Sequence, residues 1–170
     1  MRLFILQKTG YANRYAIVTS KDEVLLIDFH CDTLEDDLDT VLESLPEPKR
    51  VMILQTRQEP ALRAARERLE LLLPKAESLS PEADVTALAP RRFAGHLLQL
   101  LPMGSGLWAF ALHDYLFLGA ARDARGRWRG DDLGRKILAQ HGARRRRLWA
   151  FPATAEKVVD LSVLRALRAA

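Results

Sequence analysis

The chain of 170 residues is long enough to bury one hydrophobic core, and we predict a single domain over residues 1–170. Its 48% hydrophobic and 28% charged residues are typical of a globular protein and exclude a chain that is disordered throughout. No apolar run approaches the ~20 residues of a membrane helix, and the single cysteine, Cys31, excludes an intrachain disulfide and a multi-cysteine zinc site. The N-terminus lacks a signal-peptide pattern, so we expect a cytoplasmic protein with no membrane partner.

The first half of the chain alternates strand and helix patterns. Strands are predicted over Arg2–Gln7, Asn13–Thr19, Val24–Phe29, Arg50–Gln55 and, more briefly, Ala76–Leu79. A helix is predicted to begin at Thr33, a favourable N-cap followed by acidic residues, and to run to Leu45 before Pro46 and Pro48.

A second helix is predicted over Glu59–Leu73, and it carries the clearest periodicity in the chain. One apolar stripe at helical spacing consists of Leu62, Ala65, Leu69 and Leu72. On the other side, Glu59–Arg63, Arg63–Glu67 and Arg66–Glu70 are spaced to pair as i,i+4 ions.

The second half is richer in strands. Residues Ser80–Arg92 are polar and proline-punctuated, and we predict an irregular segment there. Strands are predicted over Gly95–Pro102, Leu107–Leu112, Tyr115–Leu118 and Arg147–Phe151, with a turn at His113-Asp114. Helices are predicted over Asp131–His141 and within Thr154–Ala170, although Lys157–Leu161 also fits an extended segment. Two strand-rich halves with flanking helices favour a sandwich of sheets, but their order alone does not exclude a doubly wound sheet.

Several short motifs, in order, resemble the metallo-β-lactamase superfamily. They are the hairpin Asn13–Val18 and Glu23–Asp28, the helix Thr33–Leu45, the strand Val51–Leu54, the loop Pro102-Met103-Gly104-Ser105-Gly106-Leu107 in place of PGHxxGS, and the strand end Tyr115–Ala121 in place of LFTGD. The resemblance covers roughly residues 10–121 and implies an α/β (α+β) fold, a compact four-layer αββα sandwich of metallo-β-lactamase type.

The chain departs from this superfamily at its metal-binding motifs. Where the superfamily has HxHxDH, this sequence reads Gln55-Thr56-Arg57-Gln58-Glu59-Pro60, so that the two histidines become Gln55 and Arg57, the aspartate Glu59 and the last histidine Pro60. The later ligands fall near Met103 or Gly104, at Ala120 and near Phe151-Pro152-Ala153, where none of the superfamily's ligand types is present.

These replacements argue against metal catalysis. A hydrolytic zinc site needs about three His, Cys or carboxylate ligands and an open position. Arg57 is a permanent cation that only donates hydrogen bonds. We therefore expect no metal and no cofactor. We expect a non-catalytic binding or structural protein that forms a homo-oligomer and has an unidentified ligand.

The degenerate pocket of the superfamily site leaves several interpretations open. Its candidate ligand-binding residues are Asp28, His30, Gln55, Arg57 and Glu59. The resemblance implies that Asp28 is a structural carboxylate that accepts hydrogen bonds from backbone amides or orients ligands. Arg57 could pair with Glu59 across the former metal position, or bind an anion at the following helix N-terminus. A relocated metal site using His30, Cys31, Asp32 and Glu59, and with it a rebuilt hydrolase, is the remaining alternative.

A basic segment gives a second functional hypothesis. Residues 122–147 hold ten Lys/Arg against three Asp, a balance of +7, whereas the rest of the chain has 16 bases and 19 acids. Arginine is interleaved with tryptophan, a composition typical of phosphate contacts and base stacking, at Arg127, Trp128, Arg129, Arg144, Arg145, Arg146 and Arg147. No nucleic-acid-binding signature accompanies it. A solvated face or a subunit contact of a homo-oligomer is the alternative.

Overall fold

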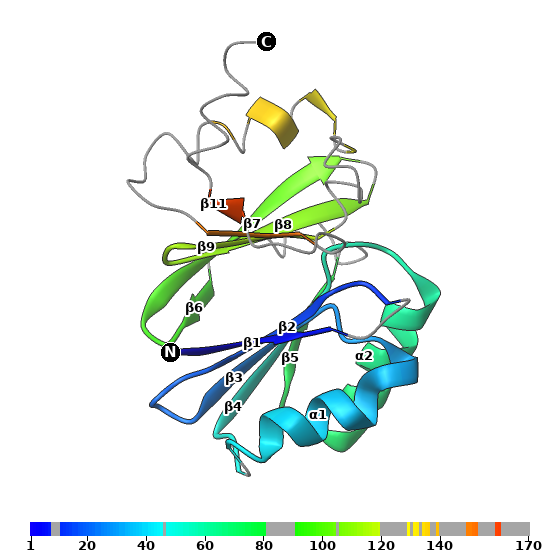
Figure 1. Cartoon of the computed structure of the whole chain (residues 1–170), viewed down its shortest axis with the longest axis vertical. Helices are drawn as coiled ribbons and strands as arrows, with labels where there is room; N and C mark the ends of the chain where they lie inside the picture. Colours follow the sequence, from blue (N-terminus) through cyan, green and yellow to red (C-terminus); the bar gives the residue numbers. More distant parts are fainter. Residues whose placement is uncertain are drawn as a thin grey trace. The chain divides into compact units, whose positions relative to one another are not determined.

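The structure is a computed structural model that describes residues 1–7, 11–45, 47–80, 91–104, 106–119, 129, 131–132, 134–136, 139, 149–152 and 159–160. The chain divides into two compact units, Met1–Ala83 and Asp84–Ala170 (Figure 1). No helix in the described part is long and apolar enough to cross a membrane.

The first unit contains a five-stranded sheet in which the strands follow chain order. The strands are β1 (Arg2–Leu6), β2 (Arg14–Val18), β3 (Glu23–Ile27), β4 (Arg50–Leu54) and β5 (Glu77–Leu79). β1, β2 and β3 pair antiparallel, whereas β3, β4 and β5 pair parallel. The parallel pairs need crossover connections, and the helices predicted from the sequence provide them. All five strands were predicted, with ends that differ by one or two residues.

Two helices cover one face of this sheet (Figure 1). A 3₁₀ turn η1 (Cys31–Thr33) leads into α1 (Leu34–Leu42), and α2 (Pro60–Leu72) connects β4 to β5. Alternate residues of the strands meet the apolar stripes of both helices because side chains alternate along a strand. The resulting core cluster is Leu6, Ala16, Val18, Val24, Leu26, Phe29, Leu34, Val41, Val51, Ile53 and Leu69.

Three details of the predicted helices are wrong. α1 ends at Leu42, before the residues expected to stop it. Thr33 makes no side-chain cap, because its hydroxyl donates instead to the buried carboxylate of Asp37 at 2.6 Å. Leu72 is 56% exposed although it completes the predicted stripe of α2, where only Leu62, Ala65 and Leu69 are buried. Of the three predicted i,i+4 pairs, Arg66–Glu70 is present at 3.7 Å.

The second unit contains a six-stranded sheet of order β11-β10-β9-β8-β7-β6. Its strands are β6 (Arg91–Phe93), β7 (His96–Gly104), β8 (Leu107–Leu112), β9 (Tyr115–Gly119), β10 (Trp149–Pro152) and β11 (Val159–Asp160). β10 pairs parallel to β9, and the other neighbours are antiparallel.

Most of the strands in this unit were predicted, and His113 lies in the expected turn with a φ of 51°. The irregular segment predicted over Ser80–Arg92 ends too late, because its last two residues belong to β6 (Arg91–Phe93). Val159 and Asp160 are extended, as the alternative for Lys157–Leu161 allowed. Within the predicted helix Asp131–His141, the described residues 132, 134–136 and 139 are helical. The rest of the final helix prediction and most of the basic segment lie outside the described residues.

Two glycines in this unit have similar backbone conformations but differ in the space available for an added Cβ atom. Gly95 and Gly104 have nearly equal φ values of +81° and +83°, which L-residues adopt only at a cost. A Cβ on Gly95 meets nothing within 4 Å, whereas one on Gly104 lies 2.1 Å from Asp131 Oδ2. The Asp131 carboxylate accepts a hydrogen bond from the Gly134 amide at 2.7 Å.

We expect Gly104→Ala to destabilise the protein more than Gly95→Ala. In both variants the left-handed backbone lowers the free energy of unfolding by about 1–2 kcal/mol. Gly104→Ala also displaces Asp131, and losing its bond to Gly134 adds about 1 kcal/mol. Urea unfolding of both variants measures the difference, and equal losses would show that Asp131 moves aside without cost.

Candidate functional site

The candidate site lies where two parallel strands of the first unit end. Asp28 follows β3, and Gln55 and Thr56 follow β4, so parallel pairing brings these residues to one edge of the sheet. The Asp28 amide donates to Leu54 O at 3.0 Å and continues the ladder beyond β3. Asp28 has a φ of 56°, a left-handed conformation that Asp tolerates better than most residues. The chain therefore turns sharply there and directs a buried carboxylate inward.

Asp28 is the centre of a hydrogen-bond network that holds β3 to the segment after β4. Its Oδ1 accepts from the Thr56 amide at 2.7 Å, and its Oδ2 accepts from the Thr56 hydroxyl and from Arg57 Nη1, the latter at 3.1 Å. The expected hydrogen bond from a backbone amide to Asp28 is thus present, donated by Thr56. Burial raises the pKa of Asp28, and Arg57 and the Thr56 hydrogen bonds act in the opposite direction.

Arg57 lies between two carboxylates. Its Nη1 contacts Asp28 Oδ2, and its Nε donates to Glu59 Oε2 at 2.7 Å. The Arg57 side chain is 13% exposed and that of Asp28 1%, whereas Glu59 is 38% exposed. The structure thus shows the Arg57–Glu59 pair that the sequence offered as one alternative. With two of its nitrogens bound to carboxylates, Arg57 is poorly placed to recruit an external anion.

The other two predicted pocket residues are not part of this network. Gln55 is buried, and its amide donates to Leu62 O of α2. His30 accepts from the Asp32 amide at 3.2 Å through Nδ1, and its ring makes an edge contact with Tyr11, with centroids 5.1 Å apart. The structure therefore brings together Asp28, Arg57 and Glu59, and it gives Gln55 and His30 separate partners.

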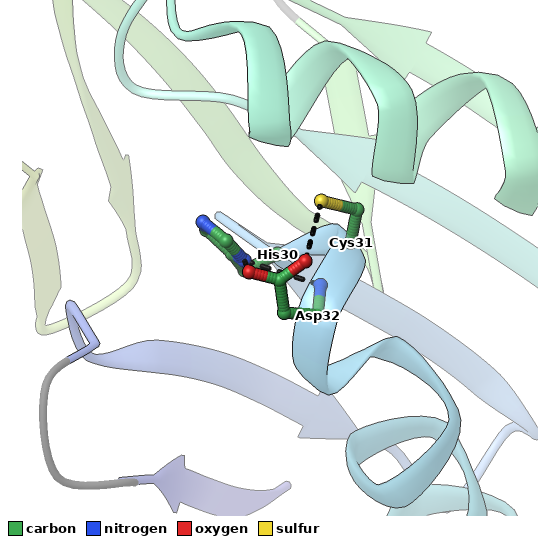
Figure 2. Close-up of side chains that lie close together, drawn as sticks. All are labelled: His30, Cys31 and Asp32. Carbon is green, nitrogen blue, oxygen red and sulfur yellow. Dashed lines mark hydrogen bonds and ion pairs between the residues drawn. The ribbon is translucent and has the colours of Figure 1, made fainter.

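His30 instead belongs to a second group of polar side chains, on the turn η1. Figure 2 shows the side chains of His30 and Cys31 on either side of the Asp32 carboxylate. The Cys31 thiol donates to Asp32 Oδ1 at 3.3 Å, and His30 Nδ1 lies 3.8 Å from Asp32 Oδ2. Burial and the neighbouring Asp32 raise the pKa of the Cys31 thiol. The thiol is thus kept protonated at neutral pH, which disfavours a catalytic nucleophile there.

A third polar cluster was not anticipated. Arg14 in β2, 2% exposed, donates through Nε and Nη2 to both carboxylate oxygens of Asp37 in α1, at 2.8 and 2.9 Å. Asp37 also accepts from Thr33, which directly follows Asp32. Thr56, the residue that binds Asp28, was missed as well. The only available signal for Thr56 was its position between the two replaced histidines.

The comparisons define the fold. Solved structures match most of the chain, and the fold is that of the metallo-β-lactamase superfamily, as predicted. No protein-family model matches the sequence, and a search of curated proteins gives no significant match.

Three of the similar structures illustrate the range of proteins with this fold. ETHE1 from Myxococcus xanthus is 18% identical with a TM-score of 0.71, and the match covers 95% of this chain and 80% of that one. The BLEG-1 B3 metallo-β-lactamase is 12% identical with a TM-score of 0.69, and 95% of each chain is covered. The Flv1 flavodiiron core from Synechocystis is 14% identical with a TM-score of 0.66, covering 93% of this chain and 51% of that one. At these identities the likeness establishes the fold alone.

Proposed function

We propose that this chain is a non-catalytic protein of the metallo-β-lactamase fold, with a binding or structural role, in which Arg57 occupies the place of a catalytic metal. The observation that carries the proposal is the guanidinium of Arg57 between the carboxylates of Asp28 and Glu59. A dication at this edge would meet a fixed positive charge and a side chain that offers no lone pair. The Arg57 ion pairs supply the charge balance that a metal would otherwise bring.

The remaining positions of the superfamily motifs also do not fit a catalytic metal. The side-chain amide of Gln55 donates a hydrogen bond to the backbone of α2. Pro60 is the first residue of α2, and its side chain has no atom that could bind a metal. Met103, which was expected in a loop, lies in β7 and is fully buried. Glu59 is the one carboxylate left in the motif, and it is paired with Arg57. One carboxylate does not make the set of about three ligands that a hydrolytic zinc site requires.

The decisive experiment measures metal content and hydrolysis together. A Cys31→Ser variant, which removes the only thiol and so isolates the Arg57 region, is loaded with excess Zn²⁺ or Fe²⁺ and desalted. We expect far less than one metal ion per chain by plasma emission spectrometry. We also expect no hydrolysis of lactam, thioester or phosphodiester substrates above the buffer rate. One tightly held metal, together with hydrolysis that EDTA abolishes, would overturn the proposal.

Nucleic-acid binding and self-association stay predictions. Of the seven residues named for nucleic acid, only Arg129 lies in the described part, where it is exposed. No geometry of that surface therefore favours one partner over the other.

A further inference from the structure

We propose that His30, Cys31 and Asp32 form a binding site for one zinc-class divalent metal ion. The site is separate from the Arg57 network and goes beyond the proposed function. It uses an imidazole nitrogen, a thiolate and a carboxylate oxygen, all from the turn η1 and the residue before it.

The distances between the three side chains fit one ion. One donor atom from each side chain can be chosen so that all three lie within 4.8 Å of one another. Cys31 Sγ lies 3.3 Å from Asp32 Oδ1, and His30 Nδ1 lies 3.8 Å from the other carboxylate oxygen, Asp32 Oδ2. Zinc bonds of about 2.0–2.3 Å in a tetrahedron place neighbouring ligand atoms roughly 3.3–3.8 Å apart. Figure 2 shows the three side chains gathered at the turn η1.

The donor types select the class of metal. A nitrogen, a sulfur and an oxygen suit Zn²⁺, Co²⁺ or Cd²⁺, whereas Mg²⁺ and Ca²⁺ prefer oxygen ligands alone. On binding, the Cys31 S–H bond breaks, its proton goes to solvent, and a metal–sulfur bond forms. Two internal hydrogen bonds, from the Cys31 thiol and from the Asp32 amide, are exchanged for metal–ligand bonds. The half-exposed Asp32 leaves a fourth position open to water.

Buried contacts on both sides hold the backbone of the site in place. Before it, Asp28 is fixed to Thr56 and Arg57. After it, Thr33 is fixed to Asp37, which in turn binds the buried Arg14. The His30 ring also rests against Tyr11. A site on a braced turn loses less entropy when a metal orders its ligands than a site on a free loop.

Cobalt titration of the full chain, stripped of metal with EDTA and dialysed, tests the proposal. Because Cys31 is the only cysteine, any sulfur-to-cobalt charge-transfer band reports on this site alone. We expect the band to appear and to reach its end point at about one Co²⁺ per chain, with Zn²⁺ displacing it. Cys31→Ser should abolish the band, and His30→Gln should weaken cobalt binding by about tenfold or more.

Controls separate this proposal from others. His113→Gln, at an exposed turn of the second unit, should leave the titration unchanged, and circular dichroism checks that each variant is folded. Absence of a charge-transfer band in the wild type at millimolar Co²⁺ overturns the proposal, and so does an end point of one Co²⁺ per two chains, which would assign the thiolate to a site shared between copies. Neither result touches the proposed function, which fails only if the Cys31→Ser variant retains a catalytic metal.

Discussion

Asp37→Ala is expected to be among the most destabilising single substitutions in the first unit, at a cost of about 3–5 kcal/mol in the free energy of unfolding. Its partner Arg14 is 2% exposed, and the substitution leaves that guanidinium buried without a counter-ion. The hydroxyl of Thr33 loses its acceptor at the same time. Urea unfolding monitored by tryptophan fluorescence or circular dichroism measures the loss.

A double variant shows whether Asp37→Ala destabilises the protein by removing the Arg14–Asp37 attraction or by leaving the charge of Arg14 buried and unpaired. In Asp37→Leu with Arg14→Met, both charges are replaced by apolar side chains, so the stability should lie closer to the wild type than that of either single variant. Arg68→Ala, which removes an exposed pair with Glu35, serves as the matched surface control and should leave the unfolding midpoint unchanged. If Asp37→Ala behaved like Arg68→Ala, the buried pair would contribute nothing to folding.

Arg57→Gln is expected to cost about 3 kcal/mol near pH 7.5 and much less near pH 4. Burial raises the pKa of Asp28 above its unfolded value, so the folded state holds its proton more tightly and stability falls as the pH rises between those two values. Arg57 limits this fall by stabilising the carboxylate. Without Arg57 the pKa of Asp28 rises further, so the loss relative to wild type grows as the pH rises from the folded-state pKa of the wild type to that of the variant.

Urea unfolding at pH 4.5, 6 and 7.5 follows this difference. Adding Asp28→Asn to Arg57→Gln removes the titrating group, and the double variant should lose the pH dependence that Arg57→Gln acquires. Glu59→Gln is the comparison variant, because Glu59 is the other carboxylate bound to the Arg57 guanidinium. Glu59 is 38% exposed, so water replaces much of what it supplies and the loss should be small. A deficit in Arg57→Gln that is constant over this pH range would show that the charge of Asp28 is not its cause.

Local sequence patterns predicted most of the fold because its elements have strong periodicity. The strands β3 and β4 follow from short continuous apolar runs, and the helix α2 follows from apolar residues at helical spacing. The exceptions arise where tertiary context overrides the local pattern. Leu72 has the spacing of the buried stripe but lies at the last residue of α2, and it is exposed there. Arg91 and Arg92 are not among the residue types enriched in strands, yet they pair with β7 in a tight hairpin.

The candidate site was predictable only in part. Asp28, Arg57 and Glu59 were identified because a known motif placed them near one another and opposite charges two residues apart suggested a pair. The role of Thr56 requires knowing that β3 and β4 are parallel neighbours, which composition does not reveal. The Arg14–Asp37 pair joins residues 23 apart, and nothing local marks either side chain as buried.

The network beyond β4 also determines how this segment exchanges its amide hydrogens with solvent. The amides of Asp28, Gln55 and Thr56 all lie past the ends of β3 and β4, yet each donates to a neighbouring strand end or carboxylate. Gln55 and Thr56 are buried, so the Gln55 hydrogen exchanges only when its bond to Leu79 O of β5 opens, and the Thr56 hydrogen only when its bond to Asp28 opens. Opening the bonds around Asp28 also exposes a desolvated carboxylate and its guanidinium partner together. A connection that looks like an ordinary loop in the sequence is therefore protected as part of the sheet, and its exchange follows the opening of strand pairs rather than local fraying.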